Sequence, residues 1–337
     1  MNLVNGNGHT LSQERQYAMV MTALKDLTPH FENNQIVEVL VNPDGAVWVD
    51  EIGLGLRKTG AWMGAPEVER AIRLMATAQH AQVGLHNASL AATIPGYGFR
   101  IQGDLPPIVE RPTLSIRKPA SLVYSLQDYV EHAIVTEEHA ALLRHSVLTK
   151  KNIIVSGGTG SGKTTLTNAL LKVASSTTDR MVLIEDNREL QCDSDNKVGL
   201  LTNVDYPMRR AVMDTLRRRP DRIIIGEIRD GAALDLLKSW NTGHPGGIST
   251  IHANDPIGAL HRLCTLIEEV VLHAPKELVG EAVDLVVHIQ RDHAHPGGRR
   301  VTGIMHVDGY DTQQQTWIVH EGSSSRERYK PCEKEQI

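Results

Sequence analysis

The sequence has little cysteine, few aromatic residues and no long apolar run. Its three cysteines, Cys192, Cys264 and Cys332, are widely spaced among 337 residues, which predicts neither a disulfide framework nor a paired-cysteine metal site. Such sparse cysteine usage is typical of a reducing cytoplasm. Aromatic residues make up only 4% of the chain, so few rings are available to stack on unpaired bases, and a dedicated reader of single-stranded nucleic acid is disfavoured.

Membrane insertion and polyanion binding are disfavoured as well. No stretch approaches the roughly 18 consecutive apolar residues of a membrane span, and the opening MNLVNGNGHTLSQERQ lacks the apolar core of an export signal. With 35 basic and 40 acidic residues the net charge is −5, which supports neither a general polyanion-binding surface nor sequence-specific nucleic-acid binding. We expect a cytoplasmic protein whose association with the inner membrane is peripheral and mediated by partner proteins.

The first third of the chain predicts an α+β domain at residues 1–120. Residues 1–15 are polar and are expected to be disordered. Residues 36–51 alternate apolar and polar side chains around a Pro-Asp-Gly turn, which predicts a β-hairpin. A helix is expected over residues 66–79, because a proline fits its first turn and apolar side chains follow at helical spacing. Short strand-like runs broken by Gly and Pro complete this domain.

A different pattern begins after residue 120. Residues 121–150 predict one or two helices that link the first domain to the second and begin its core. Residues 151–322 alternate short apolar runs with helical stretches, which predicts an α/β domain with a mostly parallel sheet covered on both faces. The polar tail, residues 323–337, is expected to be disordered. The expected strands are Asn152–Ser156, Met181–Glu185, Arg222–Glu227, Gly247–His252 and Leu285–Gln290, followed by a pair at 301–311 and 315–322.

The most informative segment is a glycine-rich loop between an apolar run and a helix. Residues 157–164 follow the phosphate-loop pattern G-x4-G-K-[ST] in the strand–loop–helix context that it requires. Glycine lets the backbone wrap closely, so that N–H groups and the helix N-terminus face phosphate oxygens. Lys163 is expected to neutralise the β- and γ-phosphates of ATP, and Thr164 to ligate Mg²⁺. The expected nucleotide-binding residues are Gly157, Gly158, Thr159, Gly160, Ser161, Gly162, Lys163, Thr164 and Thr165.

Acidic residues after two other apolar runs would complete a hydrolytic site. Glu227 lies just past the run Ile223–Ile225. Ligands of an open parallel sheet bind beyond the carboxyl ends of its strands, so Glu227 is placed to hold the Mg²⁺ shell through water. Glu185 directly follows another apolar run and is the candidate to polarise the attacking water. Asp186 and Glu189 lie in the same segment and remain alternatives for that role.

A histidine is expected at the same edge of the sheet. His252 ends the run 248–251, and an imidazole there can hydrogen-bond a γ-phosphate and report its loss. His244, in the loop Gly-His-Pro-Gly-Gly before that run, is equally well explained as a structural residue. No histidine pair has the spacing and the partners of a metal site, so histidine-bound metal is not expected.

These motifs resemble the four nucleotide boxes of the secretion traffic ATPases, which serve type II secretion, type IV pili, type IV secretion and conjugation. The matching segments are Gly157–Thr165, IEDNREL at 184–190, RIIIGEIRD at 222–230 and TGHPGGISTIHAND at 242–255. The resemblance spans residues 35–310. The upstream segments FRIQGDLPP and SIRKP favour the conjugal-transfer branch of type IV secretion, the TrbB type, with type II secretion and type IV pilus ATPases as alternatives.

The resemblance implies a RecA-like ATPase core after the N-terminal domain, a homo-hexameric ring, and nucleotide bound between the two domains. The function that it implies is an ATP-hydrolysing motor that powers pilus biogenesis and the translocation of DNA or protein, together with inner-membrane components. It also implies that arginines of the N-terminal domain reach the phosphates. By motif these are Arg100 and Arg117, whereas Arg111 is equally well explained as a surface residue. A basic stretch is either a phosphate contact or a solvated or inter-subunit helix face, and comprises Arg209, Arg210, Arg217, Arg218 and Arg219.

Other phosphate-loop proteins fit the sequence less well. A GTPase would need a base-reading motif, but the nearest segment, Asn196-Lys197-Val198-Gly199, lacks its aspartate. A transporter ATPase would need a Leu-Ser-Gly-Gly-Gln-like signature, which is absent. A small-molecule kinase would leave His252 and the N-terminal arginines unexplained. A non-hydrolysing scaffold is disfavoured by the intact set of Lys163, Thr164, Glu185 and Glu227.

Overall fold

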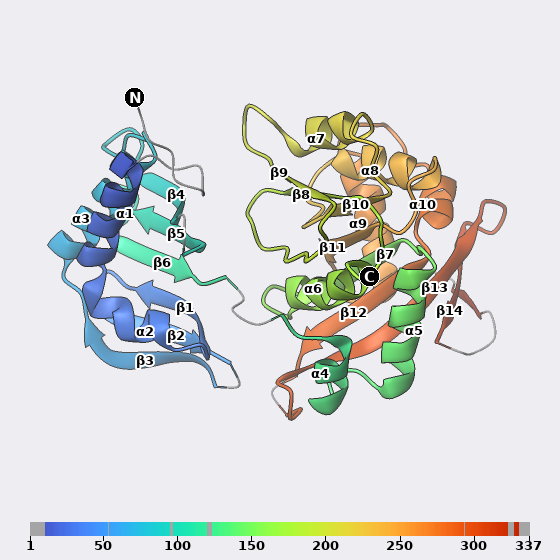
Figure 1. Ribbon diagram of the computed structural model, residues 1–337, viewed down its shortest axis with the longest axis horizontal. Helices are drawn as coiled ribbons and strands as arrows, with labels where there is room; N and C mark the ends of the chain where they lie inside the picture. Colours follow the sequence, from blue (N-terminus) through green and yellow to red (C-terminus); the bar gives the residue numbers. More distant parts are fainter. Residues whose placement is uncertain are drawn as a thin grey trace, which may run out of the picture. The chain divides into compact units, whose positions relative to one another are not determined.

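The chain folds into two compact units, Met1–Ser121 and Leu122–Ile337. The computed structural model describes residues 11–52, 54–94, 97–119, 123–292, 294–322 and 327–329, and Figure 1 gives their secondary structure. Within these ranges no helix combines the length and the apolar character that crossing a bilayer requires.

The first unit is built on a six-stranded antiparallel sheet with the order β3-β2-β1-β6-β5-β4. Strands β1 and β2 form the hairpin that the sequence predicts, with Val39 opposite Val49. The strands are β1 (Ile36–Val41), β2 (Ala46–Glu51), β3 (Gly55–Trp62), β4 (Ser89–Ile94), β5 (Phe99–Asp104) and β6 (Thr113–Arg117).

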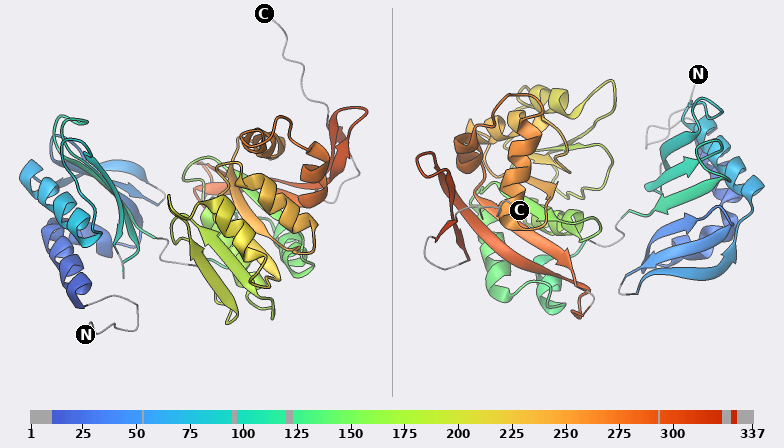
Figure 2. Two further views of the ribbon diagram at one scale, coloured as in Figure 1. Left: turned by 90° about the horizontal axis from the view of Figure 1, so that it is seen from above. Right: turned by 180° about the vertical axis from the view of Figure 1, so that it is seen from behind.

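Helices cover one face of this sheet (Figures 1 and 2). They are α1 (Leu11–Ala23), the 3-10 helix η1 (Lys25–Leu27), α2 (Thr28–Glu32) and α3 (Ala65–Ala78). Helix α3 carries Pro66 in its first turn, where a missing N–H costs nothing, and buries Val68, Ile72 and Met75 at helical spacing, which confirms the predicted helix.

Helix α1 begins inside the segment 1–15, for which the sequence predicts disorder. Residues 1–10 lie outside the described part of the chain, but from Leu11 the backbone is helical. The physical reason is burial further along the same helix, because Tyr17 and Val20 pack into the apolar core of the first unit. The helix therefore begins with polar residues and is held in place by the packing of its later turns.

The second unit contains a nine-stranded sheet with the order β15-β14-β13-β12-β7-β11-β10-β8-β9. Neighbouring strands are parallel from β12 to β9, which confirms the mostly parallel sheet, and antiparallel from β12 to β15. The strands are β7 (Ile153–Gly157), β8 (Met181–Glu185), β9 (Lys197–Leu201), β10 (Arg222–Ile225), β11 (Ile248–His252), β12 (Leu285–Arg291), β13 (Arg299–Asp311), β14 (Thr316–Glu321) and β15 (Glu327–Tyr329).

Helices lie on both faces of this sheet (Figures 1 and 2). Successive residues of a strand point to opposite faces, so Ile223 and Ile225 join the core formed with α7 to α10, whereas Ile224 joins the core formed with α4 to α6. The helices are α4 (Leu126–Glu131), α5 (Glu137–Leu148), α6 (Lys163–Ala174), α7 (Met208–Thr215), α8 (Ala232–Asn241), α9 (Pro256–Ile267) and α10 (Lys276–Ala282).

The stretch 121–150 agrees with the predicted one or two helices that begin the second core, whereas two other segments differ from the sequence prediction. The stretch 121–150 forms the two helices α4 and α5, whose apolar faces belong to the core of the second unit. Strand β9 was not predicted, because its residues alternate between partly buried and exposed at the edge of the sheet and do not form an apolar run. Residues 327–329, in the tail for which the sequence predicts disorder, pair with β14 as β15, and the rest of 323–337 lies outside the described residues.

Candidate active site

The carboxyl ends of four neighbouring parallel strands carry the residues singled out in the sequence. The order of these strands in the sheet is β7-β11-β10-β8. The loop after β7 leads into Lys163, β11 ends at His252, Glu227 follows β10 after one intervening glycine, and β8 ends at Glu185. Parallel strands end at the same edge of a sheet, so the topology gathers side chains from four separate segments of the chain there.

The phosphate loop joins β7 to α6, and Gly162 is the N-cap of that helix. Gly160 and Gly162 have φ of +66° and +103°, which residues with a side chain rarely adopt. A Cβ at Gly157 would overlap the carbonyl group of Ile289 on β12. Gly157, Gly160 and Gly162 are therefore required by the backbone conformation or by the close approach of the neighbouring strand.

Lys163 is the first residue of α6 and is 7% exposed. Its Nζ donates to the carbonyl oxygens of Gly157 and Gly158 at 3.0 and 2.9 Å, and lies 3.3 Å from Nδ1 of His252. The amine therefore lies over the mouth of the loop, next to the end of β11. Its neighbour Thr164 donates from Oγ1 to Oε2 of Glu189 at 3.4 Å.

Glu227 lies in the loop after β10, since that strand ends at Ile225 and not at residue 227 as the sequence predicted. Its carboxylate contacts His252, and Oε1 lies 2.7 Å from Nε2 of the imidazole. Oε1 is buried, and among the described residues it has no hydrogen bond of good geometry, the imidazole contact included. A buried carboxylate oxygen in this condition can accept from a metal-bound water.

Arg229 is a site residue that sequence reasoning missed. Its Nε and Nη2 donate to Oε2 of Glu227 at 2.9 and 2.5 Å, and its Nη1 donates to Oδ2 of Asp186 at 2.5 Å. It thus links the acids that follow β10 and β8. The available signal was the spacing of two residues between Glu227 and Arg229, which places both side chains on one side of an extended segment.

Glu185 is the most buried of the three acids near the end of β8, with 7% exposure. Burial raises its pKa to about 7, although the N–H groups of Glu189 and Leu190 donate to Oε1 at 2.8 and 2.6 Å and oppose that rise. Its side chain packs beside Gly226, which immediately precedes Glu227. A carboxyl group with this pKa can accept a proton near neutral pH.

The other two acids of the segment have different surroundings. Asp186 is held by Arg229, and Glu189 accepts from Thr164. Of the three candidates, Glu185 is the buried one, and burial raises its pKa. The geometry therefore favours Glu185 as the proton acceptor. Glu189 lies instead beside the Thr164 hydroxyl.

His252 lies between Lys163 and Glu227. Burial lowers its pKa, the charge of Lys163 lowers it further, and Glu227 acts in the opposite direction. Its Nδ1 faces the lysine amine and its Nε2 faces the carboxylate, so one imidazole contacts groups from two other strand ends. A side chain in this position changes its contacts whenever either neighbour moves.

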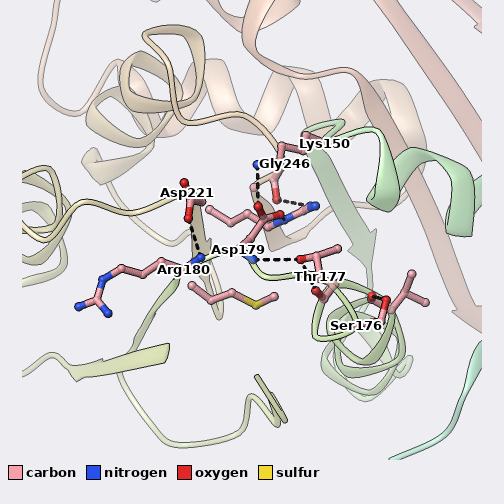
Figure 3. A network of polar contacts seen from close by, with 12 residues as sticks. Lys150, Ser176, Thr177, Asp179, Arg180, Asp221 and Gly246 are labelled. Atoms are coloured by element: carbon pink, nitrogen blue, oxygen red, sulfur yellow. Dashed lines mark hydrogen bonds and ion pairs between the residues drawn. The ribbon is translucent and has the colours of Figure 1, made fainter. Parts of the chain in front are cut away.

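His244 lies at the opposite edge of the sheet, because its loop precedes β11 and does not follow it. Its Nδ1 is 3.3 Å from the carbonyl oxygen of Ser239. At the same edge the fully buried Arg222 donates to Asp179 at 2.7 Å and to the carbonyl of Gly246 at 3.3 Å, and Lys150 donates to the other oxygen of Asp179 at 2.8 Å (Figure 3). This polar network is separate from the residues around Lys163.

Arg100 and Arg117 lie directly opposite each other on β5 and β6 of the first unit. Their strand neighbours Ile101 and Ile116 point into the helix-covered core, so the two arginines lie on the other face of the sheet. Two like charges in this relation destabilise a sheet unless an anion lies nearby. Glu38 is opposite Arg117 on β1 and supplies one negative charge.

The remaining arginines singled out in the sequence lie at exposed positions. Arg111 precedes β6 on the surface of the first unit. Three members of the basic stretch face acids on α7 and α8, which favours a solvated helix face. These pairs are Arg209–Asp235 at 2.7 Å, Arg210–Asp214 at 3.7 Å and Arg217–Asp214 at 3.9 Å.

Comparison with known proteins connects this arrangement to one family. The pattern of the family described as "Type II/IV secretion system protein" matches residues 67–319. The conjugal transfer protein TrbB of Rhizobium radiobacter is 41% identical over 307 residues, which cover 89% of this chain and 94% of that protein. The type IV secretion system protein VirB11 of Bartonella quintana is 30% identical over 308 residues, covering 79% of this chain and 85% of that protein.

A solved structure shares the fold. The X-ray structure of the ATPase DotB from Yersinia pseudotuberculosis aligns with a TM-score of 0.59 at 18% identity, covering 88% of this chain and 79% of that one. At this identity the likeness concerns the fold, and it agrees with the core that the family resemblance implies.

Proposed function

This chain belongs to the type II/IV secretion system protein family, and from that membership we propose that it is the ATPase motor of a conjugal-transfer apparatus of the type IV secretion class. One observation carries the proposal: Lys163, His252, Glu227 and Glu185 converge at the carboxyl edge of four adjacent strands. The phosphate loop supplies the nucleotide-binding element, and the acids supply what a hydrolase needs beyond binding. The 41% identity to a TrbB protein favours conjugation over the other branches.

Each residue of the edge has a role in this proposal. The N–H groups of residues 157–165 cradle the phosphates of ATP, and Lys163 neutralises the β- and γ-phosphates. Glu185 accepts a proton from the attacking water, for which a pKa of about 7 is suited. His252 contacts the γ-phosphate and transmits its loss to Lys163 and Glu227, which it touches.

Thr164 and Glu227 fit a magnesium site. Mg²⁺ prefers hydroxyl, carboxylate and water oxygens, and the buried Oε1 of Glu227, which has no hydrogen bond of good geometry among the described residues, is such an acceptor. When bound, Mg²⁺ would neutralise phosphate charge and orient the phosphates. In the proposal Thr164 holds the ion directly, Glu227 holds it through water, and Arg229 fixes the Glu227 carboxylate for that purpose.

Arg100 and Arg117 act, in this proposal, as phosphate-binding arginines contributed by the first unit. Their direct cross-strand pairing supports the role, because it places two guanidinium groups side by side, where both can donate to one phosphate group. A planar guanidinium also matches phosphate oxygens in a bidentate manner.

For assembly we propose a homo-hexameric ring that works in the cytoplasm with inner-membrane components of the transfer apparatus and contacts the membrane through them. ATP hydrolysis would drive rearrangement of the ring. The supporting observations are the family membership and the similarity to the TrbB and VirB11 proteins.

The test combines three measurements on the purified full-length chain and on cells. Magnesium-dependent ATPase activity, a native mass of six copies, and restoration of plasmid transfer in a strain lacking the corresponding gene are expected. A monomeric phosphotransferase would refute the motor. Restoration of pilus retraction or type II secretion without plasmid transfer would instead support one of the alternative branches.

A further inference from the structure

Two arginines that no motif marks lie against the phosphate loop. Arg291 is the last residue of β12 and Arg299 the first of β13, and they are direct partners across this antiparallel pair. Strand β12 is also the parallel neighbour of β7, so its carboxyl end lies beside the loop that follows β7. Residues about 130 positions after the loop in sequence therefore become its neighbours in space.

The contacts of the two side chains with the loop are specific. Arg291 Nε donates to the carbonyl oxygen of Gly160 at 2.8 Å. A Cβ placed on Gly160 would overlap the guanidinium of Arg291, and one placed on Gly162 would lie 2.5 Å from Nη1 of Arg299. Each guanidinium thus packs on the bare backbone of one of the two glycines with positive φ.

This arrangement concentrates positive charge beside the phosphate loop. Like charges directly opposite each other in neighbouring strands repel, and Lys163 adds a third positive charge at the same loop. The two arginines therefore increase the attraction of the loop for a polyanion above the attraction that Lys163 and the helix N-terminus provide alone.

The hydrogen bond to Gly160 also has a directional effect. A phosphate loop works when its N–H groups point inward at the phosphates, and carbonyl groups then point outward. Arg291 satisfies the outward carbonyl of Gly160. It stabilises the loop conformation in which the neighbouring N–H groups face the ligand, and so reduces the ordering cost of binding.

We propose that Arg291 and Arg299 are positioning residues for the β- and γ-phosphates of the nucleotide: they lie on the outer side of the phosphate loop, hold it in its binding conformation and add positive potential through it. This inference rests on the proposed nucleotide function. It assigns a task to the β12–β13 hairpin, which the four nucleotide motifs do not include.

The experiment compares three single variants of the full-length protein, Arg291→Gln, Arg299→Gln and Arg300→Gln. Arg300 is the matched control, because it follows Arg299 in sequence and its Nε lies 3.0 Å from Oδ2 of Asp292. The affinities for ATP, ADP and AMP are measured by displacement of a fluorescent ADP analogue at low and at high salt. AMP is included because it lacks the β- and γ-phosphates.

Arg291→Gln and Arg299→Gln should each weaken ATP and ADP binding roughly 3- to 30-fold, as loss of one charge several ångströms from a phosphate predicts. Binding of AMP and the melting temperature should match those of Arg300→Gln. The loss should shrink at high salt, because screening already weakens the interaction in the wild type. Arg299→Lys should restore most of the affinity, whereas Arg291→Lys should restore less, since lysine cannot reproduce the Nε geometry at Gly160.

Two results would overturn the inference while leaving the proposed function in place. One is wild-type affinity for ATP and ADP in both glutamine variants. The other is an equal loss for AMP together with a lowered melting temperature, which would show a structural role alone. Failure of the wild-type protein to bind ATP at all would remove the proposed function and this inference with it.

Discussion

Glu227 and His252 come from different strands, yet Oε1 of the glutamate lies 2.7 Å from Nε2 of the histidine. The imidazole also lies 3.3 Å from the amine of Lys163. Three residues that the sequence separates by up to 89 positions therefore form one contact chain, from the phosphate loop through β11 to the loop after β10. The imidazole of His252 therefore contacts both the lysine amine and the carboxylate.

His252→Ala should separate nucleotide chemistry from transport. We expect nucleotide binding and part of the hydrolysis to remain, because the phosphate loop and both acids stay in place, while plasmid transfer in cells is lost. His244→Ala is the matched control, since that histidine lies at the opposite edge of the sheet. Normal transfer by His252→Ala would show that its contacts with Lys163 and Glu227 only pack the site.

Lys163→Ala should abolish hydrolysis and weaken ATP binding, by about 100-fold or more in turnover, because the phosphates lose their neutralising partner in a preorganised site. Lys172→Ala, an exposed position near the other end of α6, controls for changes in helix stability. The measurements are phosphate release and nucleotide affinity. Turnover at the wild-type level would exclude this loop as the hydrolytic site.

Glu185→Gln should leave nucleotide binding largely intact and lower turnover by about 100-fold or more, as expected when a proton acceptor is lost. Glu227→Gln should likewise leave binding largely intact and lower turnover, because the carboxylate proposed to hold the metal is lost. In the wild type, turnover should rise with pH through about 7, where burial raises the pKa of Glu185. An unchanged pH profile in Glu185→Gln would assign the titration to another group.

The same pKa has a consequence for stability. A carboxyl group whose pKa is raised on folding favours the folded state below its unfolded pKa, near 4.3, and this contribution is lost as pH rises through about 7. The thermal stability of the wild type should therefore fall between pH 5 and pH 8 relative to Glu185→Gln, which has no such group. Differential scanning calorimetry across that range measures the difference.

Arg117→Gln should lower ATPase activity without destabilising the fold. The substitution removes one of two like charges paired across β5 and β6, so the free energy of unfolding should stay within about 0.5 kcal/mol of wild type. Arg111→Gln, on the same unit, serves as the control and should retain activity. Full activity of both Arg117→Gln and Arg100→Gln would exclude these arginines from the nucleotide site.

Asp179→Asn should be the most destabilising of these changes, although it is far from the chemistry. Arg222 is fully buried and its charge is compensated by Asp179, so removing that compensation should cost about 3–5 kcal/mol in urea unfolding. Lys150→Met should cost no more than about 1 kcal/mol, since that lysine is more exposed. ATPase activity per folded molecule should be unchanged in both variants.

Acid unfolding should depend on the same pair. Burial alone would raise the pKa of Asp179, but the hydrogen bonds and charges of Lys150 and Arg222 outweigh it and lower the pKa. The stability that the lowered pKa provides is present above the unfolded pKa, near 3.9, and disappears as pH falls through the folded value. Asp179→Asn should therefore lose less additional stability than the wild type below pH 4.

Much of this site could be predicted because the informative residues follow apolar runs. Strand β8 has the predicted bounds, Met181–Glu185, since a continuous buried run is flanked by polar residues on both sides. Strand β10 ends at Ile225, before the predicted Glu227, because the segment after it turns into the loop that presents the carboxylate. Sequence reasoning identifies a strand end well when side chains change from buried to polar there, and less well when a glycine intervenes.

Sequence reasoning missed Arg229 and Arg291 for a different reason. Arg229 joins acids of two strands, and Arg291 reaches Gly160 across about 130 positions, so both contacts depend on which strands are neighbours in the sheet. The order β12-β7-β11-β10-β8 cannot be read from local pattern. The position of His244 could have been inferred, because a loop that precedes a parallel strand lies at the edge opposite to the one where that strand ends.

The Arg222 network has a mechanical consequence. It joins the starts of β10 and β11 and the segments before β7 and β8 through one buried guanidinium and one carboxylate (Figure 3). Strands tied at one edge resist sliding past one another, so the sheet is stiff at the end remote from the phosphate loop. Strain that arises around Lys163 and His252 is then not absorbed by shear within the sheet. We expect it to be relieved instead by movement of the loops at the carboxyl edge.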